Sequence, residues 1–301
     1  MRALITGANG FLGAELVKQL LKKPENEVAI LVRKEASLFR LENTLDQVTR
    51  YSYEDSITEE FDVIFHLAWE GVGNAFRNIS YLDNNLKLCR YVCDVAKKTS
   101  AKKIIALGSQ AEYGPKTSAI CEDALLSPTS IYGKEKIIIC KELENFSRKE
   151  KISFIWVRVF STYGPYDNPS WLIPYVIESF LERKSPQLTL GLQQWDYLFS
   201  EDAAKAFIAL SKKSNSGIYN LGSGKVITIR SVIEMLYDIL KPGIPLIFGQ
   251  KPFASDQNFY LQANISKLLK DTAWRPRVEV DEGLKKTVEY YKKTKSILLN
   301  Q

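Results

Sequence analysis

The sequence has no hydrophobic run long enough to cross a membrane, and it has no low-complexity or repeated segment. Hydrophobic residues make up 45% and charged residues 25% of the chain, which is ordinary for a folded soluble protein and unlike a disordered one. A strand starts directly after Met1, without the apolar stretch and cleavage site of a leader. We therefore expect a cytoplasmic globular protein with no membrane partner.

Residues that commonly bind metals are also scarce, with four cysteines and one histidine in 301 residues. Cys89 and Cys93 are four positions apart, so one helical face could present both as ligands. Because no histidine and no second close cysteine pair accompanies them, we favour apolar packing within a helix and expect no metal site.

Positive charge exceeds negative charge by six, but no single segment holds the excess. Lysine-rich stretches lie near Lys97, Lys212 and Lys285, in three separate parts of the chain. This distribution indicates solvated helix faces and argues against a nucleic-acid partner. It is compatible with an anionic substrate and an anionic cofactor.

The first half of the chain alternates strands with helices. Helices are expected at 14–23 and 132–149, and apolar strands at 2–6, 27–32, 61–68 (the fourth of the sheet), 103–107 and 152–159. Continuous apolar strands separated by helices are typical of a parallel sheet that is covered on both faces. The sequence therefore predicts an α/β protein with a Rossmann-type, doubly wound parallel sheet.

The pattern changes after Tyr163-Gly164-Pro165, where prolines and aromatic residues become frequent and strict alternation ends. We expect a dinucleotide-binding Rossmann domain formed by residues 1–165 plus roughly 196–222. The remainder, roughly 166–195 plus 223–301, is expected to form a smaller α+β substrate-binding lobe over the carboxyl edge of the sheet.

A glycine-rich loop joins the first strand to the first helix. Glycines let the backbone turn sharply and approach a pyrophosphate, while the helix N-terminus offers free N–H groups and a positive dipole end. The loop follows a strand and opens a helix, as this function requires. The expected cofactor-binding residues of the loop are Gly7, Asn9, Gly10, Phe11, Leu12 and Gly13.

The end of the second strand bears on the choice of dinucleotide. A carboxylate about 20 residues beyond the glycines would bind the ribose 2′-hydroxyl of NAD. Arg33 occupies that place, and Glu35 comes slightly late. A guanidinium suits a 2′-phosphate, because it forms paired, charge-assisted hydrogen bonds. We favour NADP(H) over NAD; the alternative is that Arg33 is only an exposed loop charge.

Three residues suggest proton transfer. Tyr132 and Lys136 are four positions apart and would share one helical face, and Ser109 ends the preceding strand. A phenol titrates at about pH 10, and a nearby ammonium favours its phenolate. We expect Lys136 to be the chief cause of a lowered pKa at Tyr132, which then exchanges a proton with a carbonyl or alcohol oxygen while Ser109 hydrogen-bonds that oxygen.

The order of these and other motifs resembles one known family over nearly the whole chain. The supporting segments are 6–13, 66–68, Asn85, 108–114, Tyr132 with Lys136, 158–165, 196–197 and 219–224. The chain resembles the extended short-chain dehydrogenase/reductases, the NAD(P)-dependent sugar-nucleotide epimerase/dehydratase/reductase family.

The resemblance implies roles for individual residues. Ser109, Tyr132 and Lys136 match the catalytic set of the family, in which the lysine also holds the nicotinamide ribose. Leu67 and Ala68 lie in a segment that lines the cofactor cleft in this family, whereas His66 is expected to be a packed core residue. A homodimer through a four-helix contact is a further expectation.

The resemblance also bears on the reaction. Family 4,6-dehydratases carry an Asp-Glu pair where this chain has Gln110 and Ala111, which cannot ionise, and Glu112 comes one position late. The whole pattern most resembles reductases of nucleotide-linked 4-keto-6-deoxyhexoses, which serve O-antigen, lipopolysaccharide and other deoxysugar biosynthesis. NADPH would supply the hydride to C4 and Tyr132 the proton. The alternatives are a sugar-nucleotide epimerase, a reductase of a small non-nucleotide carbonyl, and a non-catalytic NADP-binding regulator.

The expected nucleotide-sugar site departs from the family pattern. Trp195 replaces the arginine that often precedes the Asp-Tyr element, and Ser161 replaces a frequent asparagine. A further family arginine is absent near Phe253, which leaves Lys251 as the nearest cation. The expected substrate-binding residues are Ser109, Gln110, Ser161, Trp195 and Lys251.

Overall fold

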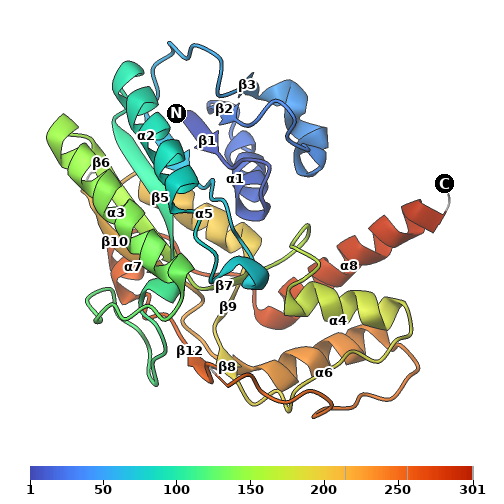
Figure 1. The fold of residues 1–301 in the computed structure, drawn as a ribbon. Coiled ribbons are helices and arrows are strands. Elements are labelled where there is room, and N and C mark those ends of the chain that lie inside the picture. Colours follow the sequence, from blue (N-terminus) through green and yellow to red (C-terminus); the bar gives the residue numbers. More distant parts are fainter. Residues whose placement is uncertain (214, 256, 300–301) are drawn as a thin grey trace.

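A seven-stranded parallel sheet forms the centre of the molecule in the computed structural model, which describes residues 1–213, 215–255 and 257–299 (Figure 1). The strand order is β10-β6-β5-β4-β1-β2-β3, and every neighbouring pair is parallel. The strands are β1 (Arg2–Thr6), β2 (Glu27–Leu31), β3 (Thr49–Tyr51), β4 (Val63–His66), β5 (Lys103–Ser109), β6 (Ser153–Val159) and β10 (Gly217–Leu221). The predicted α/β fold with a Rossmann-type sheet is confirmed.

The strand predictions differ from the structure mainly at the sheet's edge. The segment 61–68 does contain the fourth strand, but pairing is confined to Val63–His66. Edge strand β3 was missed, because its residues are exposed or only partly buried and carry no apolar pattern. An edge strand pairs on one side and needs no apolar signal of its own.

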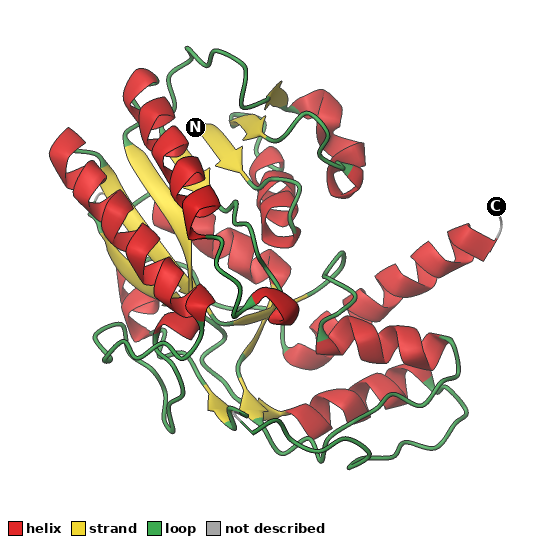
Figure 2. Cartoon of the chain, in the orientation of Figure 1, coloured by secondary structure: helices red, strands yellow, loops and turns green. Residues whose placement is uncertain are grey.

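Helices cover both faces of the sheet (Figure 2). Helices α1 (Phe11–Leu21) and α5 (Ser200–Ser211) pack on one face, and α2 (Leu82–Lys98) and α3 (Ile131–Glu150) on the other. Neighbouring residues of β1 divide between the two cores: Ile5 packs with α1 and α5, and Leu4 with α2 and α3. Cys89 and Cys93 pack in the second core, as the apolar interpretation predicted.

The strand order reverses direction at β1, which has β2 on one side and β4 on the other. In sheets of this kind, the crevice outside the carboxyl ends of the strands at the reversal is where ligands bind. The glycine loop follows β1 and Leu67 follows β4, so both lie at this crevice.

A second lobe lies beside the carboxyl edge of the sheet (Figure 1). Its core is built by α4 (Leu172–Leu181), α6 (Ile229–Leu240) and α8 (Val280–Leu299). Two small sheets border it, β11 (Ile227–Thr228) with β8 (Gln194–Trp195) and β12 (Tyr260–Leu261), and β7 (Ser161–Tyr163) with β9 (Tyr197–Phe199). Helix α7 (Ser266–Asp271) returns to pack against β10. No described helix is long and apolar enough to span a bilayer.

A buried carboxylate connects the lobe to the sheet through backbone hydrogen bonds. Asp196 has no exposed surface, and its oxygens accept hydrogen bonds from the backbone N–H groups of Ser223 (2.6 Å), Gly224 (2.9 Å) and Ala263 (3.1 Å). Asp196 thereby joins the β8–β9 segment to the turn after β10 and to the chain beyond β12. Burial raises the pKa of Asp196, and these hydrogen bonds oppose that rise.

The packing of α3 gives a prediction about stability. Leu143 is fully buried between α3 and the sheet, so Leu143→Ala should lower the free energy of unfolding by about 3 kcal/mol. Exposed Lys141, two residues earlier on the same helix, provides the control, and Lys141→Ala should change it by less than about 0.5 kcal/mol. Urea unfolding would measure both. Equal effects of the two substitutions would contradict this packing of α3.

Candidate active site

A cleft of about 1540 Å³ runs along the carboxyl edge of the sheet and is lined by both the sheet and the second lobe. It is larger than a single-ligand pocket of about 300–1,000 Å³, so it can hold a dinucleotide and a substrate together. Every site residue expected from the sequence lines this one cleft: Gly7, Asn9, Gly10, Phe11, Leu12, Gly13, Arg33, Leu67, Ala68, Ser109, Gln110, Tyr132, Lys136, Ser161, Trp195 and Lys251. Their individual roles stay predictions.

The glycine loop provides the geometry that a pyrophosphate needs. Gly7 has a left-handed backbone (φ +69°), and a Cβ there would lie 2.6 Å from the Ala68 nitrogen. A Cβ on Gly13 would lie 2.1 Å from the Gly7 oxygen, so α1 could not approach β1 this closely with a larger residue. Gly10 caps α1 without any side-chain hydrogen bond, which leaves N–H groups of the first turn available. The residues present fit a dinucleotide.

Arg33 is exposed and lines the cleft just after β2, and Ala36 and Arg40 of the following segment line it as well. The described carboxylic acids that line the cleft, Glu70 and Asp167, belong to other segments. Lys34, the neighbouring cation, pairs with Glu54 and does not line the cleft. The structure therefore places a guanidinium, and no described carboxylate, at this end of the cleft.

Arg40 connects the cofactor loop to the second lobe, and sequence reasoning missed it. Its Nη1 donates to the Asn9 carbonyl (3.2 Å) and its Nε to the Tyr166 carbonyl (3.0 Å). Tyr166 presents that carbonyl from a left-handed backbone conformation (φ 67°). The partners lie 31 and 126 positions away, so no local sequence signal could reveal this bridge.

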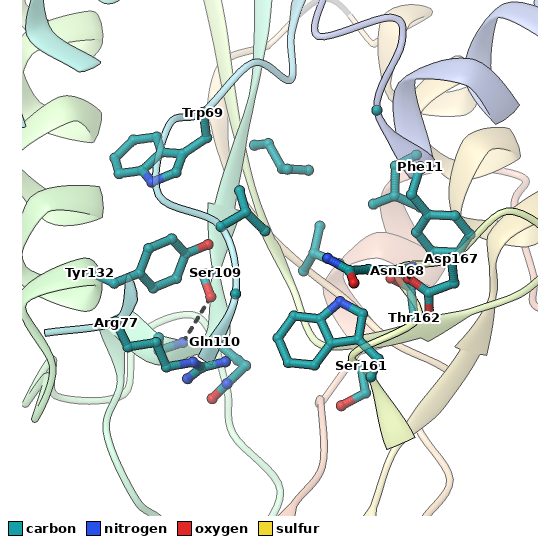
Figure 3. A pocket seen from close by; sticks show the side chains of 18 of the residues that line it. Phe11, Trp69, Arg77, Ser109, Gln110, Tyr132, Ser161, Thr162, Asp167 and Asn168 are labelled. Atoms are coloured by element: carbon teal, nitrogen blue, oxygen red, sulfur yellow. Dashed lines mark hydrogen bonds between the residues drawn. The ribbon is translucent and has the colours of Figure 1, made fainter. Parts of the chain in front are cut away.

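Ser109 is fixed by a short capping motif at the end of β5. Its Oγ accepts a hydrogen bond from the Ala111 N–H at 3.2 Å, and its own N–H donates to the Glu112 carboxylate at 2.8 Å. This reciprocal pair is a capping box on the 3-10 turn η3 (Gln110–Glu112). The hydroxyl of Ser109 is thereby held toward Tyr132 (Figure 3).

Glu112 itself belongs to a buried network. It has no exposed surface, and its oxygens accept from Arg158 Nε at 2.7 Å and from Trp156 Nε1 at 3.0 Å. Arg158 also donates to the Tyr113 hydroxyl, which donates in turn to Asn220 on β10. Because its oxygens are occupied and buried, Glu112 cannot replace the missing dehydratase acid.

Helix α3 starts where the sequence predicted. Ser130 caps it by accepting from the Gly133 N–H at 3.1 Å, so Tyr132 and Lys136 occupy its first turns. A Cβ on Gly133 would lie 2.4 Å from the Ala111 oxygen, which shows how closely α3 meets η3. The Tyr132 side chain points toward Ser109 in the cleft (Figure 3).

The expected effect of Lys136 on Tyr132 is wrong. Burial raises the pKa of Tyr132, and the groups that oppose this rise are the Ser109 hydroxyl and the Arg77 guanidinium. Lys136 donates to the Leu107 carbonyl at 2.7 Å and lies 3.6 Å from the centroid of the Trp69 ring. Burial lowers the pKa of Lys136 to about 7, so its ammonium is only partly populated at neutral pH.

His66 is a packed residue, as expected. It is buried, its Nδ1 lies 2.8 Å from the Thr6 hydroxyl, and burial lowers its pKa to about 3. The ring is therefore neutral at physiological pH, and it joins the ends of β1 and β4.

The opposite wall of the cleft comes from the segment after β6 and from the lobe. Figure 3 shows Ser161, Thr162, Asp167 and Asn168 across the cleft from Tyr132 and Ser109. Asp167 was missed by sequence reasoning; burial raises its pKa to about 7. Trp69 and Arg77 were also missed, since they lie in an irregular segment without a motif.

Comparison with known proteins establishes the family. The sequence model of the NAD dependent epimerase/dehydratase family matches residues 3–222. The chain belongs to this family. It is 26% identical over 313 residues to a Bacillus subtilis protein described as an uncharacterised UDP-glucose epimerase, covering 96% of this chain and 98% of that protein. The predicted resemblance is thus confirmed at the level of the family.

Solved structures of other proteins show the same fold. UDP-glucose 4-epimerase of Thermotoga maritima, solved with UDP-glucose, has a TM-score of 0.85 at 23% identity, over 98% of this chain and 99% of that one. The dTDP-glucose 4,6-dehydratase of Bacillus anthracis, in complex with NAD, has a TM-score of 0.82 at 23% identity, over 98% of each chain. At this identity the likeness concerns the fold alone.

The network beneath the site gives a second prediction. Arg158→Met would leave the buried Glu112 charge without its partner, so the free energy of unfolding should fall by about 3–5 kcal/mol. Adding Glu112→Gln removes that charge and should recover a large part of the loss. Chemical unfolding of the single and double variants would measure this. A double variant that is no more stable than Arg158→Met would refute the cost assigned to the unpaired carboxylate.

Proposed function

We propose that this protein is a nucleotide-sugar 4-epimerase that depends on a nicotinamide dinucleotide, the first alternative of the sequence analysis. One observation carries the proposal: the Ser109 and Tyr132 side chains face the same cleft as the glycine cradle, while Glu112, the carboxylate next to the dehydratase acid-pair positions Gln110 and Ala111, is sequestered. The site is thus equipped for proton exchange at one oxygen, and the two acid-pair positions hold no ionisable group. Relatives described as epimerases support the same choice.

The proposed roles follow from the positions of the side chains. Tyr132 takes the proton from the C4 hydroxyl and later returns it, and Ser109 hydrogen-bonds the same oxygen. Lys136 holds the cofactor ribose from the floor of the cleft. The bound cofactor supplies the hydride acceptor and donor. Epimerisation requires the keto sugar to present its other face to the same residues, and the wide cleft gives it room to turn.

The substrate half of the cleft is proposed to hold a nucleotide diphosphate. Trp195 offers an aromatic face and Lys251 a cation, while Ser161, Gln110 and Asn168 offer neutral hydrogen-bonding groups. Similar folds have been solved with UDP-sugars, which supports this class of ligand. Since Trp195 stands where many relatives have arginine, the diphosphate would depend on Lys251 and neutral donors.

A second candidate is the NADPH-dependent reduction of a nucleotide-linked 4-keto-6-deoxy sugar, as in O-antigen and other deoxysugar biosynthesis. Arg33 favours it, because a guanidinium with no described carboxylate at the end of β2 suits NADPH, the usual hydride donor in reductions. The two reactions differ in stoichiometry. A reductase consumes one NADPH per product, whereas an epimerase regenerates its cofactor in each turnover.

The decisive test incubates the purified protein with UDP-, dTDP-, GDP- and CDP-hexoses and follows the C4 configuration by NMR and the cofactor by absorbance. We expect interconversion of C4 epimers without net change in NAD(P)H. Tyr132→Phe should keep the fold and cofactor binding but lower turnover roughly 10²- to 10⁴-fold. Stoichiometric NADPH oxidation with a 4-keto sugar would instead establish the reductase. If none of the four nucleoside diphosphates binds, the nucleotide-sugar class is wrong.

Cofactor choice gives a further prediction. Arg33→Ala should weaken NADPH binding about 10- to 100-fold, the value of one charge-assisted contact of roughly 1.5–3 kcal/mol, and leave NADH binding almost unchanged. Lys34→Ala is the matched control, because Lys34 pairs with Glu54 and does not line the cleft. Calorimetric titration measures both cofactors. Equal losses of NADPH and NADH affinity would show that Arg33 does not bind the 2′-phosphate.

A further inference from the structure

Arg77 lies on the wall of the cleft that carries the candidate acid–base residue. It follows the short turn η2 (Asn74–Phe76) and precedes α2, and its carbonyl accepts a hydrogen bond from the Tyr132 N–H at 3.0 Å. Its guanidinium carbon is 5.9 Å from the centroid of the Tyr132 ring. In Figure 3 the Arg77 side chain lies beside Tyr132 and Gln110. The guanidinium is therefore next to the proposed position of the sugar.

The charge of Arg77 has no partner in the described part of the chain. The side chain is only partly exposed, yet no hydrogen bond or ion pair joins its guanidinium to any residue that the structure describes. Two described carboxylic acids line the cleft, and both form their hydrogen bonds elsewhere. Glu70 accepts from the Asn84 side chain, and Asp167 accepts from the Asn168 N–H. An unpaired guanidinium in a cleft is available to bind an anionic ligand.

The residues beside Arg77 carry no free negative charge that would repel an anion. Gln110 is neutral, and Ala111 is apolar. Glu112 is fully buried, and its carboxylate is paired with the Arg158 guanidinium at 2.7 Å. A carboxylate at position 110 or 111 would compete for Arg77. Since these positions hold none, the ligand itself can supply the missing negative charge.

The other cations of this part of the cleft have separate roles. Lys136 donates to the Leu107 carbonyl at 2.7 Å and lies 3.6 Å from the centroid of the Trp69 ring. Lys251 belongs to the second lobe and is proposed above to meet the diphosphate. Arg77 comes from the segment between β4 and α2 and adjoins Tyr132. The anionic group that it meets should therefore belong to the sugar and lie close to C4.

We propose that Arg77 binds a carboxylate of the sugar, so that the substrate is a nucleotide-linked hexuronic acid. The inference rests on the proposed function, which places the C4 oxygen of the sugar at Tyr132 and Ser109. In a hexuronic acid the carboxylate carbon, C6, is bonded to C5, the ring carbon next to C4. A carboxylate accepts the paired N–H groups of a guanidinium in bidentate geometry. Arg77 thus determines substrate specificity and takes no part in the proton transfer.

Calorimetric titration of the cofactor-loaded protein tests the inference. The probes are UDP-glucuronate, UDP-glucose and UDP, and the corresponding dTDP compounds are measured in the same way. Tyr132→Phe is the background throughout, because it removes the acid–base hydroxyl and thus prevents turnover but keeps the ring beside Arg77. We expect the glucuronate to bind more tightly than the glucose by about 10- to 100-fold, the value of one charge-assisted contact.

Substitutions assign this preference to one side chain. Arg77→Met, with Arg77→Gln in case the first does not fold, should abolish the preference by weakening the glucuronate, while the affinities for UDP-glucose and UDP change little. Arg77→Lys should retain part of the preference, because it keeps the charge but loses the paired geometry. Lys134→Met is the matched control and should keep the preference, since Lys134 is an exposed cation on α3 that does not line the cleft.

Three results would overturn the inference. One is equal binding of the glucuronate and the glucose while Arg77 is present. Another is a preference that persists in Arg77→Met and Arg77→Gln. The third is an equal loss of affinity for UDP, UDP-glucose and UDP-glucuronate in these variants, which would show that Arg77 binds the diphosphate.

These binding measurements need no turnover, so they separate the inference from the proposed function. A glucuronate preference that is lost with Arg77 upholds the inference, even where the wild-type protein does not epimerise C4 and the proposed function fails. Epimerisation of UDP-glucose by a protein without the preference upholds the proposed function and overturns the inference. If none of these nucleotides binds, the nucleotide-sugar class is wrong and the inference fails with it.

Discussion

The ion pair between Glu112 and Arg158 is the constraint on which the candidate site depends. Both side chains are almost fully buried, so removing them from water costs several kcal/mol each, and only a saturated network can offset that cost. Glu112 also accepts hydrogen bonds from Trp156 on β6 and from the backbone of Ser109 on β5. Through Arg158 and Tyr113, which follows η3, the network reaches Asn220 on β10. Three adjacent strands are thus tied together at the edge where the cleft opens.

Buried carboxylates elsewhere in the molecule also accept hydrogen bonds that connect distant segments, whereas several cations face the cleft. Asp196 and Asp202 each accept backbone N–H groups from distant segments and hold the lobe against the sheet. Among the described residues that line the cleft, basic side chains outnumber acidic ones by six to two: Arg33, Arg40, Arg77, Lys87, Lys136 and Lys251 against Glu70 and Asp167. The surplus charge of the chain therefore matters locally, where an anionic ligand would lie.

Sequence patterns could predict what is local. The strand before the glycines and the start of α3 within one residue of Tyr132 each depend on neighbours within a few residues, and both were predicted correctly. The electrostatics of Tyr132 could not be predicted. They depend first on burial, which spacing does not report, and also on the Arg77 guanidinium, more than 50 positions away in an irregular segment.

Cofactor choice and reaction type are separate questions in this cleft. A 2′-phosphate would meet Arg33 at the adenosine end, far along the dinucleotide from the end that Tyr132 and Ser109 would face, so Arg33 would bear on the reaction only through the cofactor that it favours. Arg40 is a third element of this end of the cleft, because it joins the Asn9 carbonyl of the glycine loop to the Tyr166 carbonyl of the segment after β7. This bridge positions the glycine loop against the second lobe through backbone carbonyls alone, so its geometry does not depend on whether a 2′-phosphate lies near Arg33.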